Sequence, residues 1–148
     1  MVLRNGVADE KAGPPDSFIR AVARDDYGGK KYLWMATPKG VTRYNIVEGA
    51  WTTFRPGGSS IKDDYTDIIV DEQYIWAASA GFGIQRYDKE ANTWENIQVI
   101  DGLPNNAVTA LSADGSDLWI ATEEGLGHFN FVDGIWDVFD AANGLTEI

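Results

Sequence analysis

The segment that decides the fold spans residues 118–126, which read Leu118-Trp119-Ile120-Ala121-Thr122-Glu123-Glu124-Gly125-Leu126. Two earlier stretches repeat its pattern, namely Leu33-Trp34-Met35-Ala36-Thr37 with Gly40-Val41, and Ile75-Trp76-Ala77-Ala78-Ser79 with Gly83-Ile84. The Trp of this motif recurs after 42 and then 43 residues. A second Trp follows each copy, at positions 51, 94 and 136, so all six Trp residues lie on one lattice. A repeat of this length indicates a modular architecture.

Each repeat predicts four short strands joined by tight turns. An apolar run comes first, at residues 18–23, 66–70 or 108–111, and the Trp motif forms the second strand. A Gly-containing turn leads to the third strand, and the fourth strand begins at the second Trp. The turns are short enough for antiparallel hairpins.

Four strands in about 40–45 residues is the period of a β-propeller blade, because stacked blades bury both faces of each sheet. We therefore expect an all-β fold made of three four-stranded antiparallel repeats that stand side by side as blades. The expected unit covers residues 1–148, with blades at about 17–58, 59–102 and 103–142.

The six Trp residues are predicted to form the blade core. A residue that every repeat requires usually packs in the interior. We assign this role, in preference to carbohydrate stacking, to Trp34, Trp51, Trp76, Trp94, Trp119 and Trp136.

The motif resembles the two-component regulator propeller repeat. The resemblance rests on residues 118–126, on Trp136 with Asn143-Gly144-Leu145, and on the junction Asp101-Gly102-Leu103-Pro104-Asn105-Asn106. Ala replaces a frequent Gly of that family at positions 36, 78 and 121, and His128-Phe129 replaces an Arg-Tyr pair. The resemblance implies a propeller like the extracytoplasmic sensor portion of bacterial regulators, which detects a ligand, often a carbohydrate.

Three blades leave two apolar faces to be covered, because propellers usually have four to eight blades. One expectation is that further blades of a parent protein cover them. The other is that two copies of the chain associate into six blades. In that case Val2-Leu3 could complete the last sheet of a neighbouring chain.

The charge of the chain is −11 and is unevenly distributed. Residues 1–89 hold all 12 Lys and Arg and 12 acidic residues, whereas residues 90–148 hold 11 acidic residues and no Lys or Arg. Such a field repels phosphate, so we expect no nucleic-acid partner. A cationic ligand or a basic partner surface would fit it.

Cysteine is absent, so the sequence offers neither a disulfide framework nor a thiolate metal site. We find no apolar run of 18 residues and therefore expect no membrane segment. The compartment stays open: periplasmic or extracellular for a piece of a sensor, cytoplasmic if the chain is complete.

Catalytic motifs find little support. His128 is the single His and lacks the spacing of a zinc site. The acidic cluster Asp63, Asp64 and Asp67 lacks the pattern of a calcium loop. We therefore expect a protein that is not an enzyme and has no cofactor and no metal. A propeller lyase or hydrolase is the weakest alternative.

The remaining hypothesis is a ligand-binding or sensor-type module, with an assembly scaffold that closes a six-bladed propeller as a homodimer as the alternative. In propellers, the loops before the first strand and between the second and third strands face one end, where ligands usually enter. Residues off the Trp lattice in these loops are the candidate ligand contacts: Lys39, Arg55, Tyr65, Phe82, Asn105, Glu123 and Glu124.

Overall fold

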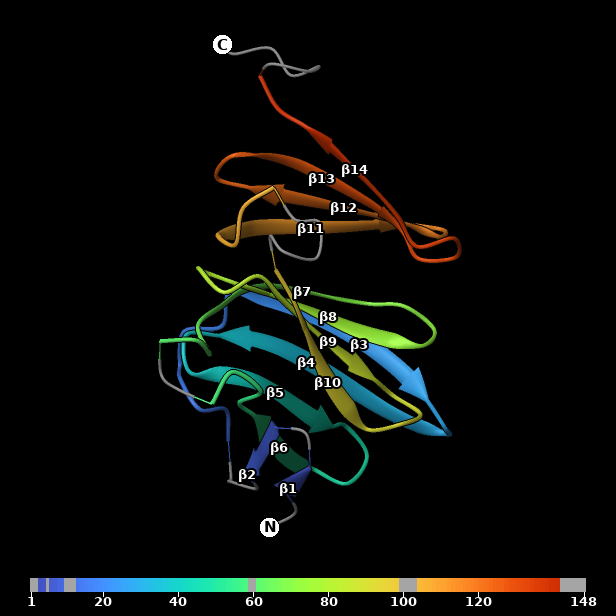
Figure 1. Cartoon of the computed structure of the whole chain (residues 1–148). Helices are drawn as coiled ribbons and strands as arrows, with labels where there is room; N and C mark the ends of the chain where they lie inside the picture. The colour runs from blue at the N-terminus through green and yellow to red at the C-terminus, as the bar shows by residue number, and fades with distance from the viewer. Residues whose placement is uncertain (1–2, 5, 10–12, 59–60, 99–103, 142–148) are drawn as a thin grey trace.

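A computed structural model describes residues 3–4, 6–9, 13–58, 61–98 and 104–141. Three antiparallel sheets contain all the regular structure of these residues, and none of them is helical (Figure 1). No helix in the described part of the chain is therefore long and apolar enough to cross a membrane.

The first sheet comprises β1 (Leu3–Arg4), β2 (Gly6–Asp9), β3 (Ala21–Tyr27), β4 (Lys30–Thr37), β5 (Gly40–Asn45) and β6 (Ala50–Phe54). The second comprises β7 (Tyr65–Val70), β8 (Tyr74–Ser79), β9 (Ile84–Asp88) and β10 (Thr93–Ile97). The third comprises β11 (Val108–Asp114), β12 (Asp117–Thr122), β13 (Gly125–Asn130) and β14 (Ile135–Phe139).

The sheets stack one on the next, and their first strands β3, β7 and β11 pack together (Figure 1). In the second and third sheets the strands follow one another in sequence order. The all-β fold of antiparallel blade-like sheets is therefore confirmed. We call the packing of the first sheet on the second the first junction, and that of the second on the third the second junction.

The first sheet differs from the expected four strands, because β1 and β2 extend it to six in the order β1-β2-β6-β5-β4-β3. Leu3 pairs with Val7, and Ala8 pairs with Phe54 of β6. The edge of β6 offers unpaired backbone groups, which these strands satisfy within the same chain. The expectation that Val2-Leu3 completes the sheet of a neighbouring chain therefore does not hold for Leu3, and Val2 lies outside the described residues.

The Trp lattice builds the first junction. Trp34 of β4 packs against Phe54 of β6, with ring centroids 5.6 Å apart. Across the junction, Tyr87 of β9 and Trp94 of β10 lie 5.5 and 6.5 Å from the same indole. Burial of four aromatic rings is a large hydrophobic contribution to stability. In the second junction Trp76 meets Phe129 at 6.2 Å.

Strand alternation explains why only some lattice Trp residues are fully buried. Trp34, Trp76 and Trp94 are 1%, 0% and 6% exposed. Trp51 lies opposite Tyr44, and Trp119 lies between two residues that face the second junction. Because neighbours along a strand point to opposite faces, Trp51 and Trp119 lie on the outer faces of the first and third sheets, where they are half-buried. Trp136 packs at the edge of the second junction and is also half-buried.

The Gly of the repeated motif has a steric role at the start of each third strand. Gly83 has φ +78°, and a Cβ there would lie 2.0 Å from the carbonyl oxygen of Ile97. At the equivalent Gly125, with φ +139°, a Cβ would lie 2.8 Å from the carbonyl oxygen of Phe139. Only Gly fits both the backbone conformation and the close approach of the fourth strand.

Candidate ligand-binding site

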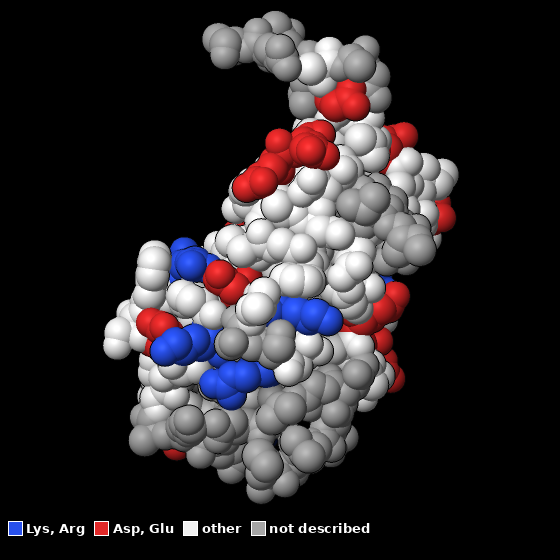
Figure 2. Space-filling view, turned by 60° about the vertical axis from the view of Figure 1, so that its left-hand side comes forward, with Lys and Arg blue, Asp and Glu red and all other residues white. Residues whose placement is uncertain are grey.

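The candidate ligand contacts from the sequence occupy turns and strand ends at one end of the sheets, on the left of Figure 1. Figure 2 brings this end forward and shows Lys and Arg side chains gathered over the first two sheets, whereas the third sheet carries Asp and Glu. Lys39 lies in the β4–β5 turn, where its Nζ is 3.7 Å from Asp16. Its carbonyl oxygen accepts a hydrogen bond from Nε of Arg55 at 3.0 Å.

The other candidates at this end lie in neighbouring segments, because the N–H of Gly83 donates to the carbonyl oxygen of Asn106 at 2.8 Å and that of Glu123 to the carbonyl oxygen of Ala107 at 3.1 Å. Phe82 in the β8–β9 turn is approached by the ammonium of Lys62, 5.7 Å from the ring centroid. Glu123 and Glu124 are exposed in the β12–β13 turn. Asn105 precedes β11, and its side chain accepts a hydrogen bond from the backbone N–H of Ala107 at 2.7 Å.

Tyr65 is placed in the core rather than in a loop. Its side chain is fully buried, and its hydroxyl donates a hydrogen bond to Oδ1 of Asp63 at 2.7 Å. Burial and the neighbouring Asp63 carboxylate raise the pKa of the Tyr65 phenol far above its ordinary value. Tyr65 therefore stabilises the packing of the sheets and is not accessible to a ligand.

The side chains of the acidic cluster Asp63, Asp64 and Asp67 do not converge on one point in the structure. Asp63 accepts from Tyr65 and from the backbone of Gly57, Asp64 pairs with Arg20, and Asp67 accepts from the backbone of Leu111 at 2.8 Å. Within the described ranges, no three His, Asp or Glu side chains are arranged to hold a metal ion.

His128 lies on the outer face of the third sheet, stacked on Trp119 with ring centroids 4.4 Å apart. Its Nε2 is 2.8 Å from Oδ1 of Asp117, and its Nδ1 is 3.3 Å from Oδ2 of Asp137. The hydrogen bond to Asp117 and, less strongly, that to Asp137 raise the His128 pKa above 6.5. His128 is therefore a strand residue at the surface, and its imidazole lies between two carboxylates.

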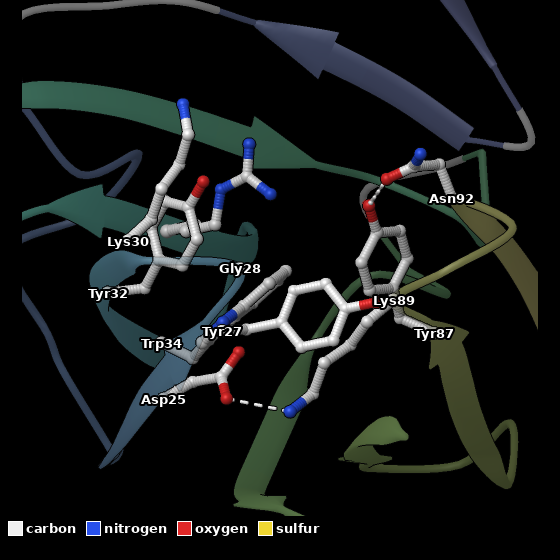
Figure 3. A pocket seen from close by; sticks show the side chains of 10 residues that line it. Asp25, Tyr27, Gly28, Lys30, Tyr32, Trp34, Tyr87, Lys89 and Asn92 are labelled. Atoms are coloured by element: carbon white, nitrogen blue, oxygen red, sulfur yellow. Dashed lines mark hydrogen bonds and ion pairs between the residues drawn. The ribbon is translucent and has the colours of Figure 1, made fainter. Parts of the chain in front are cut away.

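A cavity of about 240 Å³ lies in the first junction (Figure 3). It adjoins the β3–β4 and β9–β10 turns, at the opposite end of the sheets from the candidate loops (Figure 1). Strands β3, β4 and β5 supply one wall, and β9 with the β9–β10 turn supplies the other. The lining residues are Asp25, Tyr27, Gly28, Lys30, Tyr32, Trp34, Arg43, Tyr87, Lys89 and Asn92. None of the ligand contacts predicted from the sequence lines this cavity.

A buried ion pair joins the two walls of the cavity (Figure 3). Nζ of Lys89 lies 2.7 Å from Oδ1 of Asp25 and donates to the carbonyl oxygen of Asp71 at 2.6 Å. The two side chains are 4% and 5% exposed. A buried pair of this kind fixes geometry more than it adds stability, because desolvation offsets its attraction.

Arg43 differs from the residues at its two equivalent positions. Arg43, Arg86 and His128 each pair across a strand with the first Trp of their repeat. Arg86 binds Glu95 at 2.7 Å, and His128 contacts Asp137. The residue opposite Arg43 is Thr52, and none of the described carboxylates pairs with its guanidinium.

Instead, the Arg43 guanidinium stacks on aromatic rings, 4.5 Å from the Tyr32 centroid and 5.5 Å from that of Trp34. Stacking on a ring face uses none of the N–H groups at the edge of the guanidinium. The cavity therefore contains a cation whose hydrogen-bond donors remain available.

Two further donors at this site have no partner among the described residues. Nε1 of Trp34 is buried without a hydrogen bond, whereas the equivalent Trp76 donates to Oδ2 of Asp71 at 2.7 Å. Asn92, which has φ +56°, accepts from the Tyr87 hydroxyl at 2.6 Å through its Oδ1, so its amide N–H groups stay free (Figure 3). Several N–H donors without a partner among the described residues favour a ligand rich in acceptor oxygens.

A signal for this site exists in the sequence, as a departure from the repeat. Thr52 stands where the other repeats have Glu95 and Asp137, and Lys89 stands where the third repeat has Phe131. Aligning the repeats would have found both differences, but not the cavity that Arg43 and Lys89 line.

The second junction also has a hollow at this end, of about 630 Å³. Its lining includes Asp71, Glu72, Tyr74 and Phe131, and it contains no Lys or Arg. It therefore lacks the cationic character of the first-junction cavity.

Comparison with known proteins agrees with the repeat. The family model of the two component regulator propeller matches residues 102–124. No curated protein is similar enough in sequence to match the chain.

Solved structures share the fold. The extracellular domain of the putative hybrid two component system BT3049 from B. thetaiotaomicron superposes with a TM-score of 0.71 at 20% identity, over 86% of this chain and 19% of that one. The corresponding domain of BT4673 from the same organism gives 0.66 at 20% identity, over 86% and 18%. The computationally designed Ika4 protein gives 0.56 at 11% identity, over 86% and 93%.

The chain spans about a fifth of the length of the two extracellular domains, and at these identities the likeness concerns the fold. The family match is independent of the superpositions, because it rests on the sequence of the third repeat's junction and Trp motif. Residues 102–124 match a repeat of the two component regulator propeller family, and the sheets have the fold of those extracellular domains of two component systems.

Proposed function

We propose that this chain is a non-catalytic ligand-binding module of the sensor type and that its ligand occupies the first-junction cavity. The observation that carries the proposal is the Arg43 guanidinium, which lines the cavity without a carboxylate partner among the described residues. The likeness to extracellular domains of two component systems supports a sensing role. A carbohydrate or another small polar molecule fits a site with aromatic walls and a few polar groups.

The position of the cavity suggests how binding is transmitted. One wall belongs to the first sheet through Tyr27, Tyr32 and Arg43, and the other belongs to the second sheet through Tyr87 and Asn92. A ligand that contacts both walls stabilises one packing of the two sheets relative to others. Such a difference in affinity between two arrangements is what a sensor requires.

A thermal-shift panel of glycans and small polar molecules tests the proposal. A ligand at 100 times its Kd adds about 2.7 kcal/mol to the free energy of unfolding, which raises Tm by roughly 5–10 °C for a domain of this size. We expect the shift to be smaller in Arg43→Gln than in the wild type and unchanged in Arg86→Gln, its matched control outside the cavity. A ligand whose shift is as large in Arg43→Gln as in the wild type would place the site elsewhere.

A second candidate function, assembly through the blades, is favoured by the outer faces of the terminal sheets. On the third sheet, Trp119, Leu126 and Phe139 occupy the positions that Trp76, Ile84 and Ile97 occupy in the second junction. On the first sheet, Tyr44, Ile46 and Trp51 occupy the positions of Phe129, Phe131 and Trp136. The two outer faces thus repeat the two halves of an interface that the chain already uses.

Charge also favours contact between these two outer faces. The third-sheet face carries Asp114, Asp117 and Asp137, whereas the first-sheet face carries Arg24 and Lys31 with one acid, Asp26. Head-to-tail contact of two copies would bury both faces and close six blades. Complementary charges would fix which faces meet.

Mass measurements on variants separate this arrangement from others. We expect the wild-type chain to sediment at twice 16.3 kDa, and Trp119→Asp and Trp51→Asp each at 16.3 kDa. An equimolar mixture of the two variants should recover a dimer, because one intact face of each copy remains. An exposed apolar control, Val132→Asp, should leave the dimer unchanged. A wild-type mass of one chain, or a dimer that persists in Trp51→Asp, would exclude head-to-tail closure.

A further inference from the structure

The first-junction cavity is positive although the chain as a whole is strongly negative. Lys30, Arg43 and Lys89 line it together with one carboxylate, that of Asp25. Lys89 and Asp25 neutralise each other at 2.7 Å. Lys30 is more than half exposed and lies 3.9 Å from Glu48, so solvent and that carboxylate screen its charge. The charge that remains inside the cavity is that of Arg43.

The free edge of Arg43 has the shape that a carboxylate matches. A guanidinium presents paired N–H donors in a rigid plane and binds carboxylates through two parallel hydrogen bonds. One blade later the equivalent Arg86 does bind a carboxylate, through a hydrogen bond from Nη2 to Glu95 Oε2 of 2.7 Å. Thr52 takes the place of that acid in the first repeat, so no carboxylate among the described residues pairs with Arg43.

The rest of the cavity fits the body of a small acidic sugar. The first sheet supplies the ring of Tyr27, which is 37% exposed, and the second sheet supplies that of Tyr87, which is 4% exposed (Figure 3). The free amide N–H groups of Asn92 can donate to a hydroxyl or ring oxygen. A volume of about 240 Å³ suits one sugar ring rather than a long chain.

We propose that the ligand of the first-junction cavity is a small carboxylate-bearing molecule of the uronic-acid type, whose carboxylate binds Arg43 and whose ring packs against Tyr27. This inference rests on the proposed ligand-binding function and specifies the ligand class of the same site. It also explains why the first repeat departs from the others at Thr52.

Calorimetric titration of matched sugar pairs tests the inference. The pairs are glucuronate with glucose and galacturonate with galactose, and sodium acetate and inorganic phosphate serve as separate arms. We expect one acidic sugar to bind at least about tenfold more tightly than its neutral partner, which corresponds to about 1.4 kcal/mol. Added salt should weaken the binding of the acidic sugar and leave the affinity of the neutral sugar unchanged.

Variants assign the preference to Arg43. Arg43→Gln should bring the acidic and neutral sugars to equal affinity, Arg43→Lys should keep part of the preference, and Arg86→Gln should keep all of it. Near-ultraviolet circular dichroism of each variant checks that the aromatic junction is intact.

The outcomes distinguish the inference from the function on which it rests. Equal affinity for acidic and neutral sugars, or a preference that survives Arg43→Gln, would overturn the inference and leave the ligand-binding function in place. Tighter binding of phosphate than of either uronate would overturn the inference of a carboxylate ligand and indicate a different anion. Absence of binding by both members of both pairs would overturn the inference, and the broader thermal-shift panel would then decide the function separately.

Discussion

The first and second junctions are built on the same lattice of positions, and they differ in how their polar groups are satisfied. In the second junction Trp76 donates to Asp71, and Phe131 fills the space beside it. In the first junction the equivalent space holds Lys89, which binds Asp25, and the Trp34 N–H is left without a partner. Repetition of the apolar positions therefore builds the sheet packing, and departures from repetition create the polar cavity.

The largest expected effect breaks the ion pair of the first junction. Lys89→Ala should lower the free energy of unfolding by about 3–5 kcal/mol, because it leaves a buried carboxylate uncompensated. Lys89→Phe should cost less, since it reproduces the Phe131 arrangement and releases Asp25 to accept from Trp34. Urea denaturation of the two variants measures the difference. Equal losses of unfolding free energy in the two variants would contradict the equivalence of Lys89 in the first junction with Phe131 in the second.

A smaller difference in stability is expected between variants of Trp34 and Trp76. Trp76→Phe removes a donor and leaves Asp71 with an unsatisfied oxygen, whereas Trp34→Phe removes an N–H that has no partner. We expect Trp76→Phe to be about 1–2 kcal/mol more destabilising than Trp34→Phe. Both substitutions remove similar apolar area, so each serves as the control for the other in chemical denaturation. The reverse order would show that the Trp34 N–H is satisfied in solution.

The smallest expected effect compares His128 with Arg86 at the equivalent position. The folded-state pKa of His128 lies above 6.5, mainly because of its hydrogen bond to Asp117. Protonated His128 therefore contributes its full stabilisation of the folded state below about pH 6.5. This contribution is lost as the pH rises through the raised folded-state pKa. Tm should fall slightly over that interval in the wild type. His128→Arg, which keeps its charge, should show a flatter profile, and an unchanged slope would rule out His128 as the cause.

The fold could be predicted from the sequence because the Trp lattice repeats three times and blade packing requires large apolar groups at fixed positions. The expected first strand at residues 18–23 was displaced to Ala21–Tyr27. Its apolar residues suggested one boundary, but pairing with β4 and the contact of Asp25 with Lys89 extend the strand through polar residues.

The cavity could not be predicted in the same way. It forms between side chains that are far apart in sequence, such as Asp25 and Lys89, and their meeting depends on how two sheets pack. The loops at the other end were predicted to contact a ligand because they vary between repeats. Tyr65, selected there, proved to be buried because it stands at the first position of β7, within the core.

Two-dimensional NMR of the six Trp indole N–H groups tests the central claim most directly. Trp34 lines the proposed site, Trp76 is its buried counterpart in the second junction, and Trp119 lies on an outer face. At a concentration that just saturates the wild type, glucuronate or galacturonate should shift the Trp34 resonance, leave those of Trp76 and Trp119 in place, and shift Trp34 less in Arg43→Gln. A ligand-induced shift confined to Trp76 or Trp119, or one at Trp34 that is undiminished in Arg43→Gln, would contradict the account.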